Sequence, residues 1–182
     1  MRRYLLLATT VALTAASSGS RVDSGERDVS TSGLATASIA PAMVVNRLER
    51  FEALDHKRAR TEVTLEVIVL GPEGREHGEL TIYHDQYRRI KKLDGRVFDE
   101  SGKTVRKLKK EHIEDVSAVT GESLYEEGRI RTARLYHTVY PYRVEYSYEL
   151  EHDGLLNWPA WYPGDQSIPT LRTSFEIVAP RS

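Results

Sequence analysis

The segment from Tyr140 to Leu150, YPYRVEYSYEL, constrains the fold more than any other part of the chain. From Tyr142 onward, aromatic and aliphatic side chains alternate with charged or small polar ones. Successive side chains of a β-strand point to opposite faces, so this pattern predicts a strand with one buried and one solvated face. Pro141 indicates the start of the strand or a sheet edge, because proline has no N–H to donate.

Further segments show the same two-residue period. Met43–Leu54 fits both helical and strand spacing, and we favour a hairpin of Val45–Leu54 with Ala59–Leu70 over a helix followed by a strand. The Asp94-Gly95 dipeptide between two extended runs predicts a tight turn. Leu171–Val178 predicts a final strand. Many short strands without a long helix predict an all-β fold, an antiparallel β-sandwich.

The chain divides into three parts. Residues 1–16 have two arginines, a short apolar stretch and small residues, the order typical of a secretory signal peptide. Residues 17–42 are rich in Ser, Thr, Gly and Ala and predict a disordered linker. Residues 43–182 form the predicted sandwich domain. We therefore expect a periplasmic or secreted protein, with no lipid anchor because the sequence has no cysteine.

Composition narrows the possible functions. The 26 basic and 27 acidic residues give a net charge of -1, so no overall field favours nucleic acid, and we expect no nucleic-acid partner. The absence of cysteine excludes disulfides, a thiolate nucleophile and cysteine-bound zinc. The one basic cluster, Lys103–Lys110, is interpreted as a solvated strand face or turn, with binding of nucleic acid, anionic lipid or acidic glycan as the alternatives.

Three stretches carry a resemblance to a known family. They are Asp94–Val119 with its Gly-Lys and basic run, His137–Leu156 with the Tyr-Pro-Tyr-x-Val-Glu-Tyr strand, and Trp158–Pro180 with its tryptophan-proline turn. The chain resembles the bacterial domain of unknown function found in front of transglutaminase-like domains in exported proteins. It departs from the family at Glu126–Arg129.

The resemblance implies a module without a catalytic centre. In larger members the Cys-His-Asp catalytic set belongs to the following domain, so the resemblance assigns no catalytic residue to this chain. It implies a structural or interaction role, with a transglutaminase-like or protease-like domain on another chain as candidate partner. The residues agree, since there is no Gly-x-Ser-x-Gly elbow, Gly-rich phosphate loop or His-x-His pair. We expect neither an enzyme nor a cofactor or metal.

An aromatic cluster supports an alternative function. Trp158, Trp161 and Tyr162 lie beside two prolines. If exposed, these rings would stack on sugar rings or peptide and make the protein a cell-surface module for cell-wall glycan or peptide. If buried, they would cap the sandwich, which is the commoner role of tryptophan.

Overall fold

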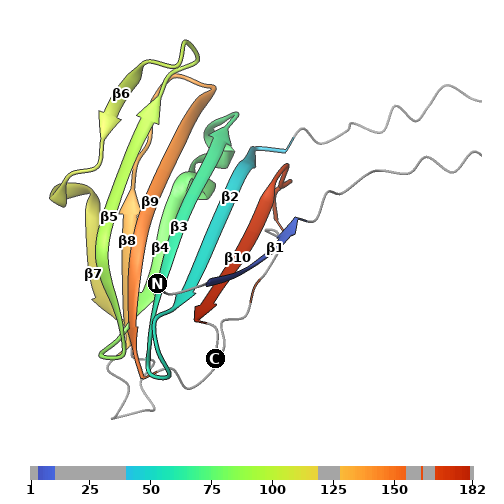
Figure 1. Ribbon diagram of the computed structural model, residues 1–182. Helices are drawn as coiled ribbons and strands as arrows, with labels where there is room; N and C mark the ends of the chain where they lie inside the picture. Colours follow the sequence, from blue (N-terminus) through green and yellow to red (C-terminus); the bar gives the residue numbers. More distant parts are fainter. Residues whose placement is uncertain (1–3, 11–39, 119–127, 155–160, 162–166, 181–182) are drawn as a thin grey trace, which may run out of the picture.

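The computed structural model describes residues 4–10, 40–118, 128–154, 161 and 167–180. These residues form two β-sheets with two short 3₁₀ helices (Figure 1). The all-β prediction is confirmed. No helix in the described part of the chain is long and apolar enough to cross a membrane.

The larger sheet has seven strands in the order β1-β10-β2-β3-β9-β5-β6. Their bounds are Tyr4–Thr10 for β1, Thr173–Pro180 for β10, Ala42–Ala53 for β2, Arg58–Val69 for β3, Tyr142–Asp153 for β9, Arg88–Phe98 for β5 and Thr104–Lys107 for β6. The predicted β2–β3 hairpin is present, as is the strand after Pro141. Strand β10 pairs parallel to β2, so the predicted antiparallel arrangement includes one parallel pairing.

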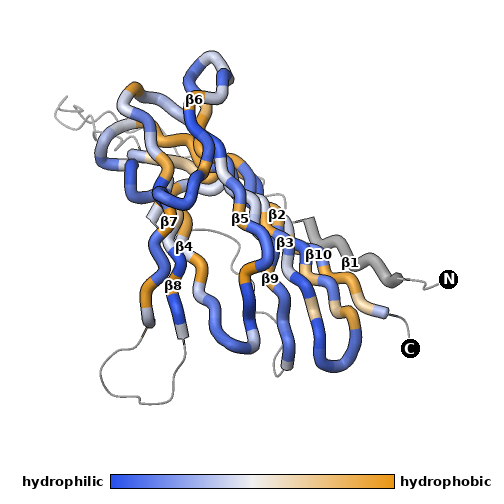
Figure 2. The backbone as a smooth tube through the Cα atoms, turned by 90° about the vertical axis from the view of Figure 1, so that its left-hand side faces the viewer, coloured by the Kyte–Doolittle hydropathy of each residue, from blue (hydrophilic) through white to orange (hydrophobic). Residues whose placement is uncertain are grey.

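The smaller sheet has the order β4-β8-β7. Strand β4 spans Glu79–His84, β8 spans Arg129–Arg134 and β7 spans Ile113–Ser117, and both pairings are antiparallel. Helix η1, Pro72–Gly78, leads into β4, and helix η2, Lys110–His112, leads into β7. The side view in Figure 2 shows this sheet facing β5, β9 and β3 of the larger one. The chain therefore crosses repeatedly between two layers.

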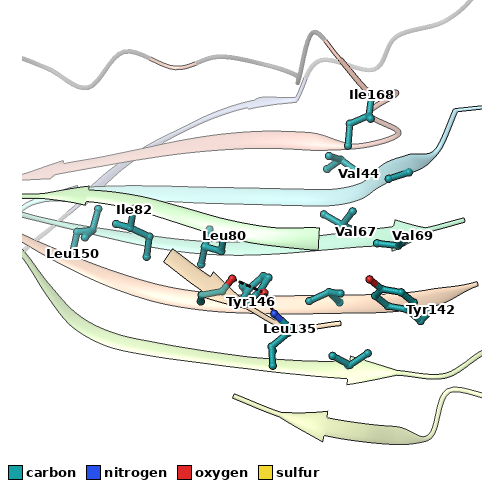
Figure 3. Close-up of a cluster of buried hydrophobic side chains, with 14 residues drawn as sticks. Val44, Val67, Val69, Leu80, Ile82, Leu135, Tyr142, Tyr146, Leu150 and Ile168 are labelled. Carbon is teal, nitrogen blue, oxygen red and sulfur yellow. Dashed lines mark hydrogen bonds between the residues drawn. The ribbon is translucent and has the colours of Figure 1, made fainter. Parts of the chain in front are cut away.

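The main core lies between the two sheets. Figure 3 shows side chains of β2, β3 and β9 meeting those of β4 and the segment after β8. The fully buried members of this core include Val67, Val144 and Leu135. Strands β3 and β9 bury close to every second residue here, as the alternating sequence predicts.

Tyr146 joins the two layers at the centre of this core. The Leu135 N–H donates to the Tyr146 hydroxyl oxygen over 3.1 Å. The hydroxyl lies 3.0 Å from the carbonyl oxygens of both Gly78 and Ala133, which share its single hydrogen. Burial raises the pKa of Tyr146 above its ordinary value, so the ring remains a neutral hydrogen-bonding link.

The predicted tight turn at Asp94-Gly95 is wrong. Strand β5 continues through both residues, and Gly95 pairs with Tyr146 of β9. A Cβ atom on Gly95 would lie 2.8 Å from Tyr146 Cδ1 and 2.9 Å from Leu135 Cδ1. The glycine is needed because other side chains fill its place, not because the chain turns.

Strand β1 lies within the predicted signal peptide. Tyr4–Thr10 pairs antiparallel with β10 at the edge of the larger sheet. The pairing describes the chain before any cleavage, and export stays a prediction. Most of the predicted linker lies outside the described residues, but its last residue, Ala42, is already the first of β2.

Candidate functional site

The aromatic cluster predicted from sequence is described at one position. Trp161 is half-buried, and its ring stacks on Phe175 of β10 with a centroid separation of 5.9 Å. Phe175 packs against a second buried cluster, formed by Phe51, Ala53 and Ala59. Trp161 thus uses a ring face for packing within the domain. Trp158 and Tyr162 lie outside the described residues, and ligand binding by this cluster stays a prediction.

A polar cluster that joins three strands lies on the smaller sheet, around the Asp115 carboxylate of β7. Arg129 Nε donates to Asp115 Oδ1 over 2.7 Å, and Arg131 Nε donates to Oδ2 over 2.8 Å. His84 Nε2 of β4 lies 3.1 Å from Oδ2. Arg129 also donates through a terminal nitrogen to the backbone oxygen of Asp115 over 3.0 Å.

Strand register brings these residues together. Asp115 pairs with Arg131 across β7 and β8, and His84 pairs with Arg129 across β4 and β8. In both pairings the side chains project on the face that carries buried Ile82 and Ala133 further along. The cluster therefore continues the core face of the smaller sheet with polar groups.

The chemistry of the cluster is that of an ion-pair network. Partial burial of Asp115 favours its neutral form, but hydrogen bonds from Arg131 and Arg129 and the charge of His84 outweigh this and lower its pKa to about 2. A carboxylate held so strongly ionised is a poor proton acceptor at neutral pH. Asp115 thus orients the two guanidinium groups and the imidazole rather than serving as a general base.

An open hollow of about 410 Å³ lies beside this network. It is lined by His84, Asp85, Gln86, Ser117, Gly128 and Arg129. Asp85 is engaged in the turn between β4 and β5, where its Oδ1 accepts from the backbone N–H groups of Tyr87 and Arg88. The lining of the hollow is thus polar, and its two basic side chains, His84 and Arg129, are both held by Asp115.

The other histidines do not gather into a metal centre. Across the described ranges, no group of three or more His, Cys, Asp or Glu side chains is placed to hold a metal ion. His152 Nε2 lies 2.8 Å from the Thr61 hydroxyl, and its ring meets Phe51 edge-on at 5.8 Å. Burial, followed by the charge of Arg88, lowers the pKa of His152, so the neutral ring is favoured.

Residues 56–182 match the family described as a domain of unknown function with solved structure, DUF3857. The chain belongs to this family. No curated protein matches it. The fold is similar to the crystal structure of a "putative protease" from Parabacteroides distasonis, with a TM-score of 0.64 and 12% sequence identity. That match covers 78% of this DUF3857 chain and 29% of the larger protein.

Sequence reasoning missed the Asp115 network. Its members come from three strands that are far apart along the chain, and only the register of the smaller sheet brings them together. The spacing of Arg129 and Arg131 with a single residue between them was the available signal, since such residues share a strand face.

Proposed function

We propose that this DUF3857 domain is a non-catalytic module of an exported protein. In this proposal it acts by binding a protease-like or transglutaminase-like domain carried on another chain. The observation that carries the proposal is the structural match, in which this fold makes up 29% of a larger protein named for a protease activity. Most of that larger protein therefore lies outside the part that resembles this fold.

The chemistry of the described residues supports this role. Asp115 has a histidine beside it, but hydrogen bonds from Arg129 and Arg131 lower its pKa to about 2. It is therefore a poor general base at neutral pH. The sequence contains no cysteine, the nucleophile of transglutaminase-like centres. Binding of glycan or peptide by the aromatic cluster ranks second, because Trp161 packs on Phe175.

Reconstitution tests the proposal. The tagged full chain is recovered from the envelope of the cell that produces it, and bound proteins are identified by mass spectrometry. A partner with a protease-like or transglutaminase-like domain is then purified and titrated with the chain by calorimetry. We expect saturable 1:1 binding, and no peptide hydrolysis or transamidation by the DUF3857 chain alone.

Two outcomes contradict the proposal. One is hydrolysis or transamidation by the purified chain itself that is abolished by Asp115→Asn. The other is a repeated failure of every purified catalytic-domain candidate to bind the folded chain. Recovery of cell-wall glycan instead, lost on Trp161→Ala, would move the assignment to the second function.

A further inference from the structure

Among the described residues, most positive charges have a carboxylate within ion-pair distance, and four of those without one lie together at one sheet edge. On β5, Lys91 lies 2.7 Å from Glu151 and Lys92 lies 2.6 Å from Glu149. By contrast, four side chains on and beside β6 have no carboxylate of a described residue within 4.0 Å. They are Lys103, Arg106, Lys107 and Lys110, and we call them the β6 basic patch.

A fifth cation, Arg75, lies next to this patch because its guanidinium stacks on the same aromatic ring as that of Arg106. The Arg106 guanidinium lies over the Tyr136 ring, 5.0 Å from its centroid, and the Arg75 guanidinium lies 3.6 Å from the same centroid. Stacking on a ring restricts a guanidinium but leaves its in-plane N–H groups free to donate. Among the described residues, Arg75 also has no carboxylate within ion-pair distance.

The patch borders a hollow rather than a flat surface. An open depression of about 590 Å³ is lined by residues 104–107 of β6 and by Lys109, Glu111 and His112 of the following turn. The one carboxylate in its lining, Glu111, lies 3.7 Å from both Lys109 Nζ and His112 Nε2. His112 Nδ1 accepts from the Lys109 N–H over 3.0 Å, which fixes the turn beside the hollow.

We propose that the hollow beside the β6 basic patch is a binding site for a phosphate group. Three observations carry this inference: the unpaired cations, the two stacked guanidiniums and the concave lining with a single carboxylate. The proposal is independent of the catalytic partner proposed above, because it concerns a different part of the surface from the Asp115 network.

Phosphate fits this site better than a carboxylate ligand. Arg106 and Lys107 line the hollow without a carboxylate of a described residue in ion-pair range, and Lys103 and Lys110 are immediate sequence neighbours of its lining residues. A phosphate monoester has about 1.5 to 2 negative charges at neutral pH, against one for a carboxylate. Its oxygens accept from ammonium and guanidinium donors together. The Tyr136 ring is already covered by guanidiniums, so it offers no platform for stacking the bases of a nucleic acid.

Titration of the full chain with tripolyphosphate tests the site. The test variant is Lys107→Gln/Lys110→Gln, and the matched control is Lys91→Gln/Lys92→Gln, which removes the same charge from paired positions on β5. We expect saturable binding that weakens with added NaCl. The test variant should bind about tenfold more weakly or worse, while the control stays within about twofold of the parent.

Two further arms identify the source of the phosphate. Vesicles of phosphatidylglycerol in phosphatidylcholine report a lipid headgroup, and pure phosphatidylcholine vesicles are their control. Binding to tripolyphosphate alone assigns a soluble ligand, and binding to both probes with the same loss in the test variant assigns a headgroup.

Three results would overturn the proposal. These are no saturable binding to either probe, equal weakening in the test and control variants, or equally tight binding of a polyglutamate peptide of the same charge. Thermal unfolding of each variant shows that its fold is intact. Arg75→Gln, outside β6, provides an independent substitution and should also weaken tripolyphosphate binding.

Discussion

Two tyrosines on β9, four residues apart, should respond in opposite ways to loss of their hydroxyl groups. Tyr146→Phe removes the acceptor of the buried Leu135 N–H and the donor to the carbonyls of Gly78 and Ala133. A buried polar group left without a partner costs about 1–3 kcal/mol. We expect Tyr146→Phe to lower the free energy of unfolding by about 2 kcal/mol, a large part of the margin of an ordinary domain.

Tyr142→Phe is the matched control. The Tyr142 hydroxyl is buried and has no hydrogen-bond partner in the described part of the chain. Burial is the main cause that raises the pKa of Tyr142 to about 12, while the charge of Arg75 and the His137 backbone act to lower it. Removing an unsatisfied hydroxyl gives back its desolvation cost, so the variant should be as stable as the parent or up to about 1 kcal/mol more stable.

Urea unfolding followed by far-UV circular dichroism measures both variants. Tyr146→Phe should lower the midpoint without changing the slope, because the surface exposed on unfolding is the same. The reasoning is refuted if Tyr146→Phe unfolds within about 0.5 kcal/mol of the parent, the range typical of neutral surface changes. It is refuted equally if Tyr142→Phe loses as much stability as Tyr146→Phe.

Three further predictions concern stability. Gly95→Ala should cost about 1–3 kcal/mol in urea unfolding because its Cβ meets two packed side chains, whereas Gly71→Ala, near a movable Glu73 carboxylate, should cost less; equal losses would contradict this. The Asp115 pKa lies below its usual 3.8, so the contribution of this carboxylate to the free energy of unfolding is complete above pH 3.8 and disappears as the pH falls towards about 2. Asp115→Asn should flatten the pH dependence of stability in this range, and an unchanged profile would argue against the network. The His152 pKa also lies below its usual 6.5, so the contribution of the neutral ring to stability is complete above pH 6.5 and decreases on acidification. His152→Gln should remove the fall in melting temperature between pH 7 and pH 5, and a fall that persists in this variant would belong to other groups.

The sequence predicted the strands best where one face is buried. The alternation from Tyr142 onward identified β9, and the choice of a hairpin for Val45–Leu54 with Ala59–Leu70 matches β2 and β3. These segments pack against the other layer on one side and face solvent on the other. Apolar and polar residues therefore alternate along their sequence with a period of two.

Prediction failed where distant contacts decide the local structure. Asp94-Gly95 carries a turn signal, but strand β5 continues through it, and a glycine is required because the side chains of Tyr146 and Leu135 occupy the place of a Cβ atom. The Asp115 network depends on strand register, which a single sequence specifies only weakly at polar positions. The parallel pairing of β10 with β2 likewise involves segments at opposite ends of the domain.

That parallel pairing has a consequence for how the protein is made. Arg47 near the beginning of the domain pairs with Thr173 near its end, so one edge of β2 has no neighbour until almost the whole domain has been synthesised. The β2–β3 hairpin is local and can form early, but the complete seven-stranded sheet must wait. During synthesis the chain therefore carries an open, partly apolar strand edge, the kind of surface that chaperones protect from association with other chains.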